Sequence, residues 1–202
     1  MKYPNLEWGK MEAVVNKLGG IEGMEAFLRG ETILAPSREK HLFDLRLTHW
    51  LPGTESFEIG SHFKEERRKR AEVYLYQPDA QFLISFGDKV EGPCEKAVLK
   101  VSRLLGAATD IDIIGRLVGQ RPIVVRFSQI WRLLCSQGHG EAGTLLTNGQ
   151  FNIFYVHDSQ GKLHTIRVHW VNNESGFSGW SMVSQRIPRE GSRSVGTQII
   201  YD

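Results

Sequence analysis

The chain has 202 residues, of which 41% are hydrophobic, 10% aromatic and 24% charged, with 25 Lys and Arg against 23 Asp and Glu. This composition is that of an ordinary globular protein, and it excludes a disordered chain, a collagen-like repeat, a disulfide scaffold and a coiled coil as the main architecture. The formal net charge of +2 does not by itself demand nucleic acid, an anionic membrane or an acidic partner.

Residues 1–30 are predicted to form a helical hairpin that is a module of its own. Apolar side chains recur at three- and four-residue spacing from Trp8 to Leu18 and from Ile21 to Leu28, and glycine follows each run. The second helix carries Glu22 and Glu25 with one arginine, which is not the basic face that a DNA-reading helix presents to phosphates. We therefore expect the hairpin to pack against or dock on protein.

Residues 31–120 are predicted to form a mixed α/β region. A strand is expected over Leu42–Trp50, where apolar and polar residues partly alternate before a Pro-Gly turn. Two short β-rich runs, Glu72–Gln77 and Gln81–Phe86, are separated by a turn that begins at Pro78. These two runs are expected to pair as a hairpin.

Helical spacing returns in the second half of this region. Apolar residues predict helices over 97–105 and 111–118, and each is followed by glycine. The charged segment 64–70 is typical of a solvated helix face, with a phosphate-contacting patch as the alternative. Because helix-rich and strand-rich stretches exchange near Gly119–Arg121, we expect a boundary there.

Residues 121–202 are predicted to form an antiparallel sheet with one packed helix. A β-branched run, Pro122–Phe127, precedes Ser128, which is expected to cap a helix whose apolar face includes Ile130 and Leu134. The chain then becomes mostly β and closes with a strand over Gln198–Tyr201. The whole chain is therefore assigned to the α+β class.

The clearest local structure is a hairpin of Phe151–His157 with Leu163–Val171, for which two registers compete. With a two-residue turn at 160–161, one face of the hairpin is almost wholly apolar. A shift of one residue instead places Arg167 and His169 on the face that holds the first apolar residues of the hairpin. Burial favours the first register.

In that register His157 and His164 lie directly opposite each other beside the turn. Cross-strand Cβ atoms are about 5 Å apart, so two imidazoles could share a proton or a metal. His139 is a candidate third group, but two histidines alone do not make a metal site, and we predict neither a metal nor a cofactor. A pair of rim histidines without chemistry is the alternative interpretation.

The C-terminal part is mildly basic and rich in aromatic residues. From Arg116 onward it carries nine Lys and Arg against five Asp and Glu, a net +4, whereas the preceding residues carry 16 against 18, a net −2. Cations with aromatic rings are typical of surfaces that bind single-stranded nucleic acid and of surfaces that bind protein. The residues predicted to bind a partner are Arg167, His169, Trp170, Trp180 and Arg186.

Known catalytic motifs are missing from the sequence. It holds no P-loop, no dinucleotide-binding glycine motif, no nucleophile elbow and no zinc-protease helix. Cys94 and Cys135 are far apart and are expected to be reduced, structural thiols, and no apolar run has the length of a signal peptide or a membrane span. These features predict a cytoplasmic protein without a membrane segment.

Two parts of the sequence resemble a large, uncharacterised group of short proteins from candidate-phylum bacteria. The run VNKLGGIEGMEAFLRG, Val15–Gly30, is similar to the recurring opening module of that group. The C-terminal order of a helix around Ile130–Cys135 and then a hairpin with the turn 158–162 is similar to its usual ending. The resemblance implies a bacterial, modular protein, and it brings no activity and no site residue.

The sequence therefore supports a non-catalytic interaction or regulatory protein with a protein partner, or a nucleic-acid partner, on its C-terminal sheet. A nucleic-acid-processing hydrolase that uses the histidine pair is one alternative, and a single-stranded nucleic-acid binder is another. Oligomeric state does not follow from the sequence.

Overall fold

The computed structural model describes residues 9, 12, 15–16, 18, 20–30, 42–65, 71–117, 123–172, 178–187 and 191–202, and the chain divides into two compact units, Met1–His41 and Leu42–Asp202. In the first unit, helix α2 (Ile21–Leu28) begins after Gly20 and ends before Gly30, both with positive φ. This confirms the second helix of the predicted hairpin. Most of the first helix, and residues 66–70 of the charged segment, lie outside the described residues.

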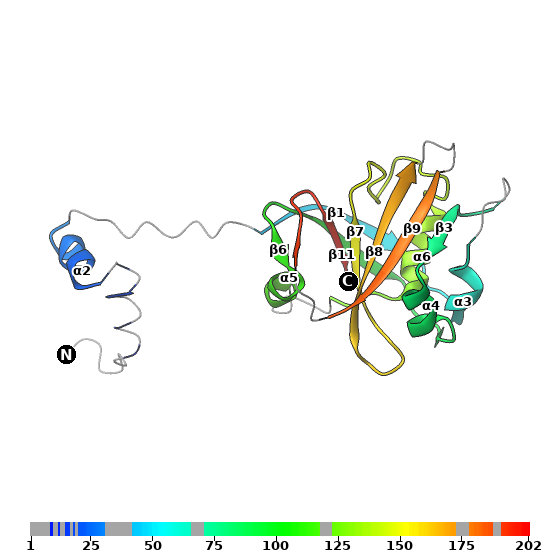
Figure 1. Ribbon diagram of the computed structural model, residues 1–202, viewed down its shortest axis with the longest axis horizontal. Helices are drawn as coiled ribbons and strands as arrows, with labels where there is room; N and C mark the ends of the chain where they lie inside the picture. Colours follow the sequence, from blue (N-terminus) through cyan, green and yellow to red (C-terminus); the bar gives the residue numbers. More distant parts are fainter. Residues whose placement is uncertain are drawn as a thin grey trace. The chain divides into compact units, whose positions relative to one another are not determined.

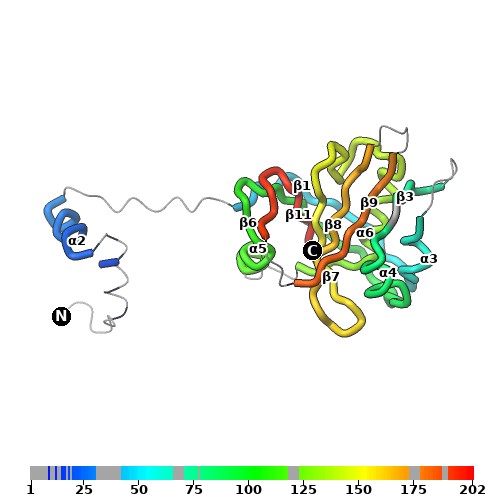
Figure 2. Tube along the Cα trace, viewed as in Figure 1, coloured from blue at the N-terminus to red at the C-terminus, as the bar shows by residue number. Residues whose placement is uncertain are grey.

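The second unit is built on a mixed sheet, in which seven strands are formed by the described residues (Figures 1 and 2). In spatial order these are β1 (Phe43–Leu51), β5 (Ala97–Leu104), β11 (Gln198–Tyr201), β7 (Asn152–His157), β8 (Leu163–Asn172), β9 (Ser178–Arg186) and β3 (Leu75–Pro78). The pairs β11–β7 and β9–β3 are parallel and the others are antiparallel. The α+β class is confirmed, but the predicted antiparallel C-terminal sheet is part of this larger mixed sheet.

Helices cover both faces of the sheet. Helices α3 (Ile59–His62), α4 (Ala80–Phe86) and α6 (Phe127–Cys135) contribute to one core, and α5 (Asp110–Leu117) contributes to a second core (Figure 1). Since successive side chains of a strand point to opposite faces, alternate residues of β7 enter the two cores. All of β7 except its last residue is buried as a result.

Two pairs of short strands complete the second unit. One pair is β2 (Phe57–Glu58) with β4 (Val90–Glu91), and the other is β6 (Ala108–Thr109) with β10 (Ser192–Arg193). The second pair ties the segment after β9 to the start of α5. It also brings Arg193 to the buried carboxylate of Asp110.

The predicted hairpin over 72–86 is wrong in its second half. Residues Ala80–Phe86 form helix α4, because the Asp79 side chain accepts a hydrogen bond of 2.6 Å from the Phe82 N–H and caps the helix. Phe82 and Phe86, four residues apart, both enter the core. The apolar residues of this segment fit both the alternating spacing of a strand and the spacing of a helix. The packing of Phe82 and Phe86 in the core selects the helix.

The helix predicted over 97–105 is strand β5, because this segment pairs with β1 on one side and with β11 on the other. A strand covered on both faces lacks the polar alternation of a surface strand, and its apolar run imitates a helix. Helix α5 is confirmed within one residue, and the closing strand Gln198–Tyr201 is confirmed as predicted.

In the β-branched run Pro122–Phe127, the described residues from 123 onward reach the sheet at one isolated bridge, between Val124 and Tyr155. Helix α6 starts at Phe127, and the residue that precedes it is Arg126, so Ser128 is not its cap. The predicted boundary near Gly119–Arg121 lies outside the described residues. Strands from both sides of it share one sheet, so the unit continues across it.

Replacing Arg193 by Met is expected to destabilise this unit strongly. Its Nε donates to Asp110 Oδ1 at 3.0 Å, its Nη2 also bonds the carboxylate, and the Tyr155 hydroxyl donates to the same Oδ1 at 3.0 Å, with all three residues buried. The variant leaves a buried carboxylate without its cation, so urea denaturation should show a loss of about 3–5 kcal/mol in the free energy of unfolding.

The matched control is Arg46→Met. Arg46 pairs with Asp44 at 2.8 Å, but both side chains are exposed, and such a pair contributes about 0–1 kcal/mol. Equal losses in the two variants would contradict the role of the buried pair.

Candidate functional site

The hairpin register differs by one residue from the prediction. Val156 lies opposite His164, and His157 lies opposite Leu163, so the two histidines point to opposite faces of the sheet. The burial argument fails because both faces of β7 are covered by protein. The connection is a five-residue loop, 158–162, rather than a two-residue turn.

Asp158 fixes the geometry of this loop. Its Oδ1 accepts hydrogen bonds of 2.8 Å from the N–H groups of Gln160 and Lys162. Its own N–H donates to the Lys162 carbonyl, and Gly161 adopts a positive φ of 74°. An aspartate that accepts from the N–H two residues later is a known turn device, and this signal in the sequence points to the longer loop.

His164 is buried and is hydrogen-bonded on both ring nitrogens. Its Nε2 lies 3.0 Å from Asp158 Oδ2, and its Nδ1 lies 3.4 Å from Ser184 Oγ. A Ser–His–Asp chain of this kind suggests a nucleophile with its base. However, Ser184 is only 4% exposed and its N–H donates to the carboxylate of Asp79. These hydrogen bonds therefore hold the His164 ring in place, and they do not activate an accessible hydroxyl.

A pocket of about 230 Å³ opens beside His164 and is called here the α4–β9 pocket. It lies where the start and middle of α4, the 158–162 loop and the end of β9 come together. Its lining residues are Gln81, Ile84, Ser85, Asp158, Ser159, Gln160, Lys162, His164 and Arg186. Of the residues predicted from the sequence, the structure brings His164 and Arg186 together here.

The electrostatics of the α4–β9 pocket favour an anion. Burial raises the pKa of Asp158, but the N–H of Lys162, the His164 ring and the N–H of Gln160 lower it further, so the net pKa lies below its usual value. The carboxylate is thus ionised at neutral pH and already engaged by its own loop. Lys162 and Arg186, both exposed, add two positive charges to the lining and suit a carboxylate or phosphate.

Trp170 and Trp180 do not form a binding surface. Both are buried in the core on the α6 side of the sheet, with their rings edge to face at 5.3 Å. The Trp180 indole N–H donates to the Gln137 carbonyl at 2.8 Å, and that of Trp170 donates to Asn172. Their prediction as partner-binding residues is corrected, because an indole enclosed by the core cannot stack on a ligand.

Arg167 and His169 lie on the opposite face, around the ring of Phe151. The Arg167 guanidinium carbon is 4.9 Å from the centre of that ring, and the His169 ring lies at 4.7 Å. Burial, followed by the charge of Arg167, lowers the pKa of His169. Both side chains are half-buried and face away from the α4–β9 pocket.

His139 does not join the other histidines. Its Nε2 lies 2.9 Å from the Ala71 carbonyl, its Nδ1 lies 3.6 Å from Glu141, and its ring packs on Tyr74. No group of three His, Cys, Asp or Glu side chains among the described residues is arranged to hold a metal ion. The constellation on which the hydrolase hypothesis depends is therefore not assembled.

None of the helices in the described part of the chain has the length and apolar character that a membrane span requires. Comparison of the chain with family models, with curated proteins and with solved structures finds no match. The chemistry of the α4–β9 pocket therefore follows from its own residues. The sequence prediction missed Gln81 and Ser85, because it assigned α4 to a strand, and it missed Asp158 and Lys162, because it assumed a two-residue turn.

Replacing Asp158 by Asn is expected to lower the free energy of unfolding at pH 7 by about 2 kcal/mol, because the carboxylate accepts charge-assisted hydrogen bonds from its loop. The lowered pKa of Asp158 means that this stabilisation is complete above about pH 5, begins to fall as the pH approaches the unfolded-state pKa, and is lost as the pH falls through the folded-state pKa. Urea denaturation at pH 7 and pH 3 should show a difference between the two proteins that shrinks in acid.

Asp88→Asn is the control, since Asp88 is exposed in the turn after α4 and its replacement should change the free energy of unfolding by less than about 0.5 kcal/mol. A difference between wild type and Asp158→Asn that stays constant down to pH 3 would be evidence against the role of the carboxylate.

Proposed function

We propose that this protein is a non-catalytic interaction or regulatory protein that binds an acidic segment of a partner protein in the α4–β9 pocket. The observation that carries the proposal is the charge of the lining: Lys162 and Arg186 surround a pocket whose own carboxylate, Asp158, is satisfied by its loop. A volume of about 230 Å³ suits one anionic side chain better than an extended backbone.

The surroundings of the pocket favour protein over nucleic acid. Helix α4 exposes Ile84, which is 78% accessible and lines the pocket, and Leu83 beside it. These apolar side chains can contact a hydrophobic residue next to the acidic group. Single-stranded nucleic acid is bound by stacking of its bases on aromatic rings. Among the described residues of the lining there is no Phe, Tyr or Trp, and His164 is only 3% exposed.

A non-catalytic role is favoured by the buried state of Ser184 and by the separation of His157 from His164. In the first unit, α2 leaves Ile21 and Leu28 exposed, which supports the docking role proposed for the N-terminal module. The same proposal includes a cytoplasmic location, since Cys94 and Cys135 are free thiols, and the bacterial origin that the resemblance implies.

The test is titration of the full chain with a labelled peptide, Glu-Glu-Leu-Glu-Glu-Leu, followed by fluorescence anisotropy at low salt. We expect Arg186→Gln and Lys162→Gln each to weaken binding about fivefold, because each removes one charge-assisted contact at a partly solvated rim. Raising the salt concentration should weaken the wild-type complex further.

Arg116→Gln is the matched control, because it removes the same charge from the exposed surface of α5, on the other face of the sheet. The dissociation constant of the peptide for Arg116→Gln should stay within about twofold of the wild-type value, since exposed charges act mainly at short range. Equal weakening in all three variants, or no binding, overturns the proposal. Tighter binding of a twelve-residue oligothymidylate, lost in Arg186→Gln, would favour the nucleic-acid alternative instead.

A further inference from the structure

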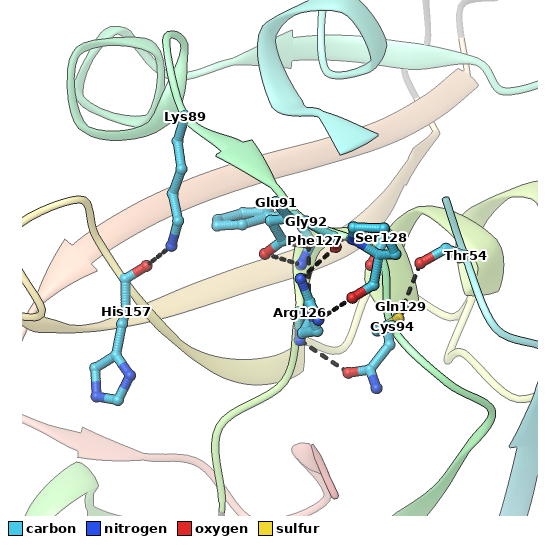
Figure 3. Close-up of polar contacts among 11 residues, drawn as sticks. Thr54, Lys89, Glu91, Gly92, Cys94, Arg126, Phe127, Ser128, Gln129 and His157 are labelled. Atoms are coloured by element: carbon cyan, nitrogen blue, oxygen red, sulfur yellow. Dashed lines mark hydrogen bonds and ion pairs between the residues drawn. The ribbon is translucent and has the colours of Figure 1, made fainter. Parts of the chain in front are cut away.

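A cluster of polar groups around a thiol lies at the start of α6, where Cys94 faces Thr54 (Figure 3). The two residues form an isolated antiparallel bridge, with both N–H to carbonyl hydrogen bonds at 2.9 Å. This pairing places Thr54 Oγ1 2.9 Å from Cys94 Sγ. The thiol is partly exposed, so a small reagent can reach it while its neighbour is held by the backbone.

A fixed cation lies beside this thiol. The Arg126 guanidinium donates to the carbonyl of Gly92 at 2.6 Å and to that of Pro93 at 3.3 Å, the two residues that precede Cys94 (Figure 3). The nearby carboxylate of Glu91 accepts from the N–H groups of Phe127 and Ser128 at 2.9 and 3.0 Å. Both carboxylate oxygens are therefore engaged by the first turn of α6, and Oε2 also lies 3.8 Å from the Nε of Arg126, so Glu91 holds the guanidinium in place beside the thiol.

The hydroxyl of Ser128 is the observation that points to a ligand. Ser128 is 1% exposed, and its Oγ has no hydrogen-bond partner in the described part of the chain. Its Oγ lies close enough to the Cys94 sulfur to favour the thiolate, but without the geometry of a full hydrogen bond. A buried hydroxyl without a partner is costly, and an oxygen atom added to the sulfur would give it one.

The two cysteines of the chain have opposite environments. Burial raises the pKa of Cys94, but Thr54, the Ser128 hydroxyl and the Arg126 charge lower it further, so the net pKa is below its usual value. Burial, followed by Glu72, raises the pKa of Cys135 to about 12. Because the thiolate is the nucleophile, Cys135 is an internal control for Cys94.

We propose that Cys94 is an oxidation site that reacts with hydrogen peroxide to give a sulfenic acid, whose oxygen is held by Thr54 and Ser128. The sulfur attacks one peroxide oxygen, the O–O bond breaks, and the released hydroxide takes up the proton that the thiol has lost, giving water. Sulfur is oxidised by two electrons and peroxide is reduced. Arg126 and the two hydroxyls stabilise the negative charge that develops on the leaving oxygen. The site shares no residue with the α4–β9 pocket.

The test uses the full, reduced chain at pH 7 with hydrogen peroxide and dimedone, which traps sulfenic acids, and peptide mass spectrometry to follow each cysteine. Cys94 should be labelled at least about tenfold faster than Cys135, and faster than N-acetylcysteine amide under the same conditions. Labelling of Cys94 at or below the rate of the small thiol overturns the proposal.

The variant Ser128→Ala tests whether the hydroxyl speeds the reaction of Cys94 with peroxide in particular or changes the reactivity of the thiol toward every reagent. We expect it to slow oxidation of Cys94 by about tenfold, while alkylation by iodoacetamide, which has no leaving oxygen, changes less. The control is Ser136→Ala at the other end of α6, where the hydroxyl donates to the Leu133 carbonyl at 2.7 Å, and its oxidation rate should equal that of wild type. An unchanged oxidation rate in Ser128→Ala would refute the assignment of that hydroxyl.

Discussion

The second unit depends on one short strand at the end of the chain. β11 is four residues long and fully buried, and it lies between β5 and β7, antiparallel to the first and parallel to the second. Among the described strands it is the one that joins the pair β1–β5 to the group β7–β8–β9–β3. Ile199 faces the core under α5 and Ile200 faces the core under α6, so this strand connects both hydrophobic cores.

The burial of β7 on both faces affects the register of the hairpin that β7 forms with β8. β11 pairs with one edge of β7, and the two hydrophobic cores cover both faces of β7. Neither face is open to water, so the loop chemistry of Asp158 decides the register instead of the apolar pattern. That register turns His164 toward α4, where Phe86 lies edge to face with its ring at 5.1 Å, and leaves His157 on the other side. The α4–β9 pocket forms in consequence.

The parts of the fold that the sequence predicts well are those whose pattern is local. The amphipathic repeats of α2 and α5, the two strands of the 151–171 hairpin and the closing strand at Gln198–Tyr201 are all recognisable without tertiary information. β5 and the register of the hairpin are not, because both depend on neighbours distant in sequence. The burial of Trp180 has the same cause, since an aromatic residue in a strand fits a core face and a binding face equally well.

The hydrogen bonds made by buried polar side chains differ between residues that hold the fold together and the proposed oxidation site. The side chains of Gln137, Asn152 and Gln198 are buried, and each makes hydrogen bonds that fix the 136–150 segment against the sheet. Folding satisfies these groups, so they need no ligand. Ser128 Oγ is also buried and makes no full hydrogen bond, and the same is true of Thr165 Oγ1. An unpaired hydroxyl adds nothing to stability, and what distinguishes that of Ser128 is its position beside the Cys94 thiol, whose pKa it lowers. Chemistry at the sulfur is therefore the role that we propose for it.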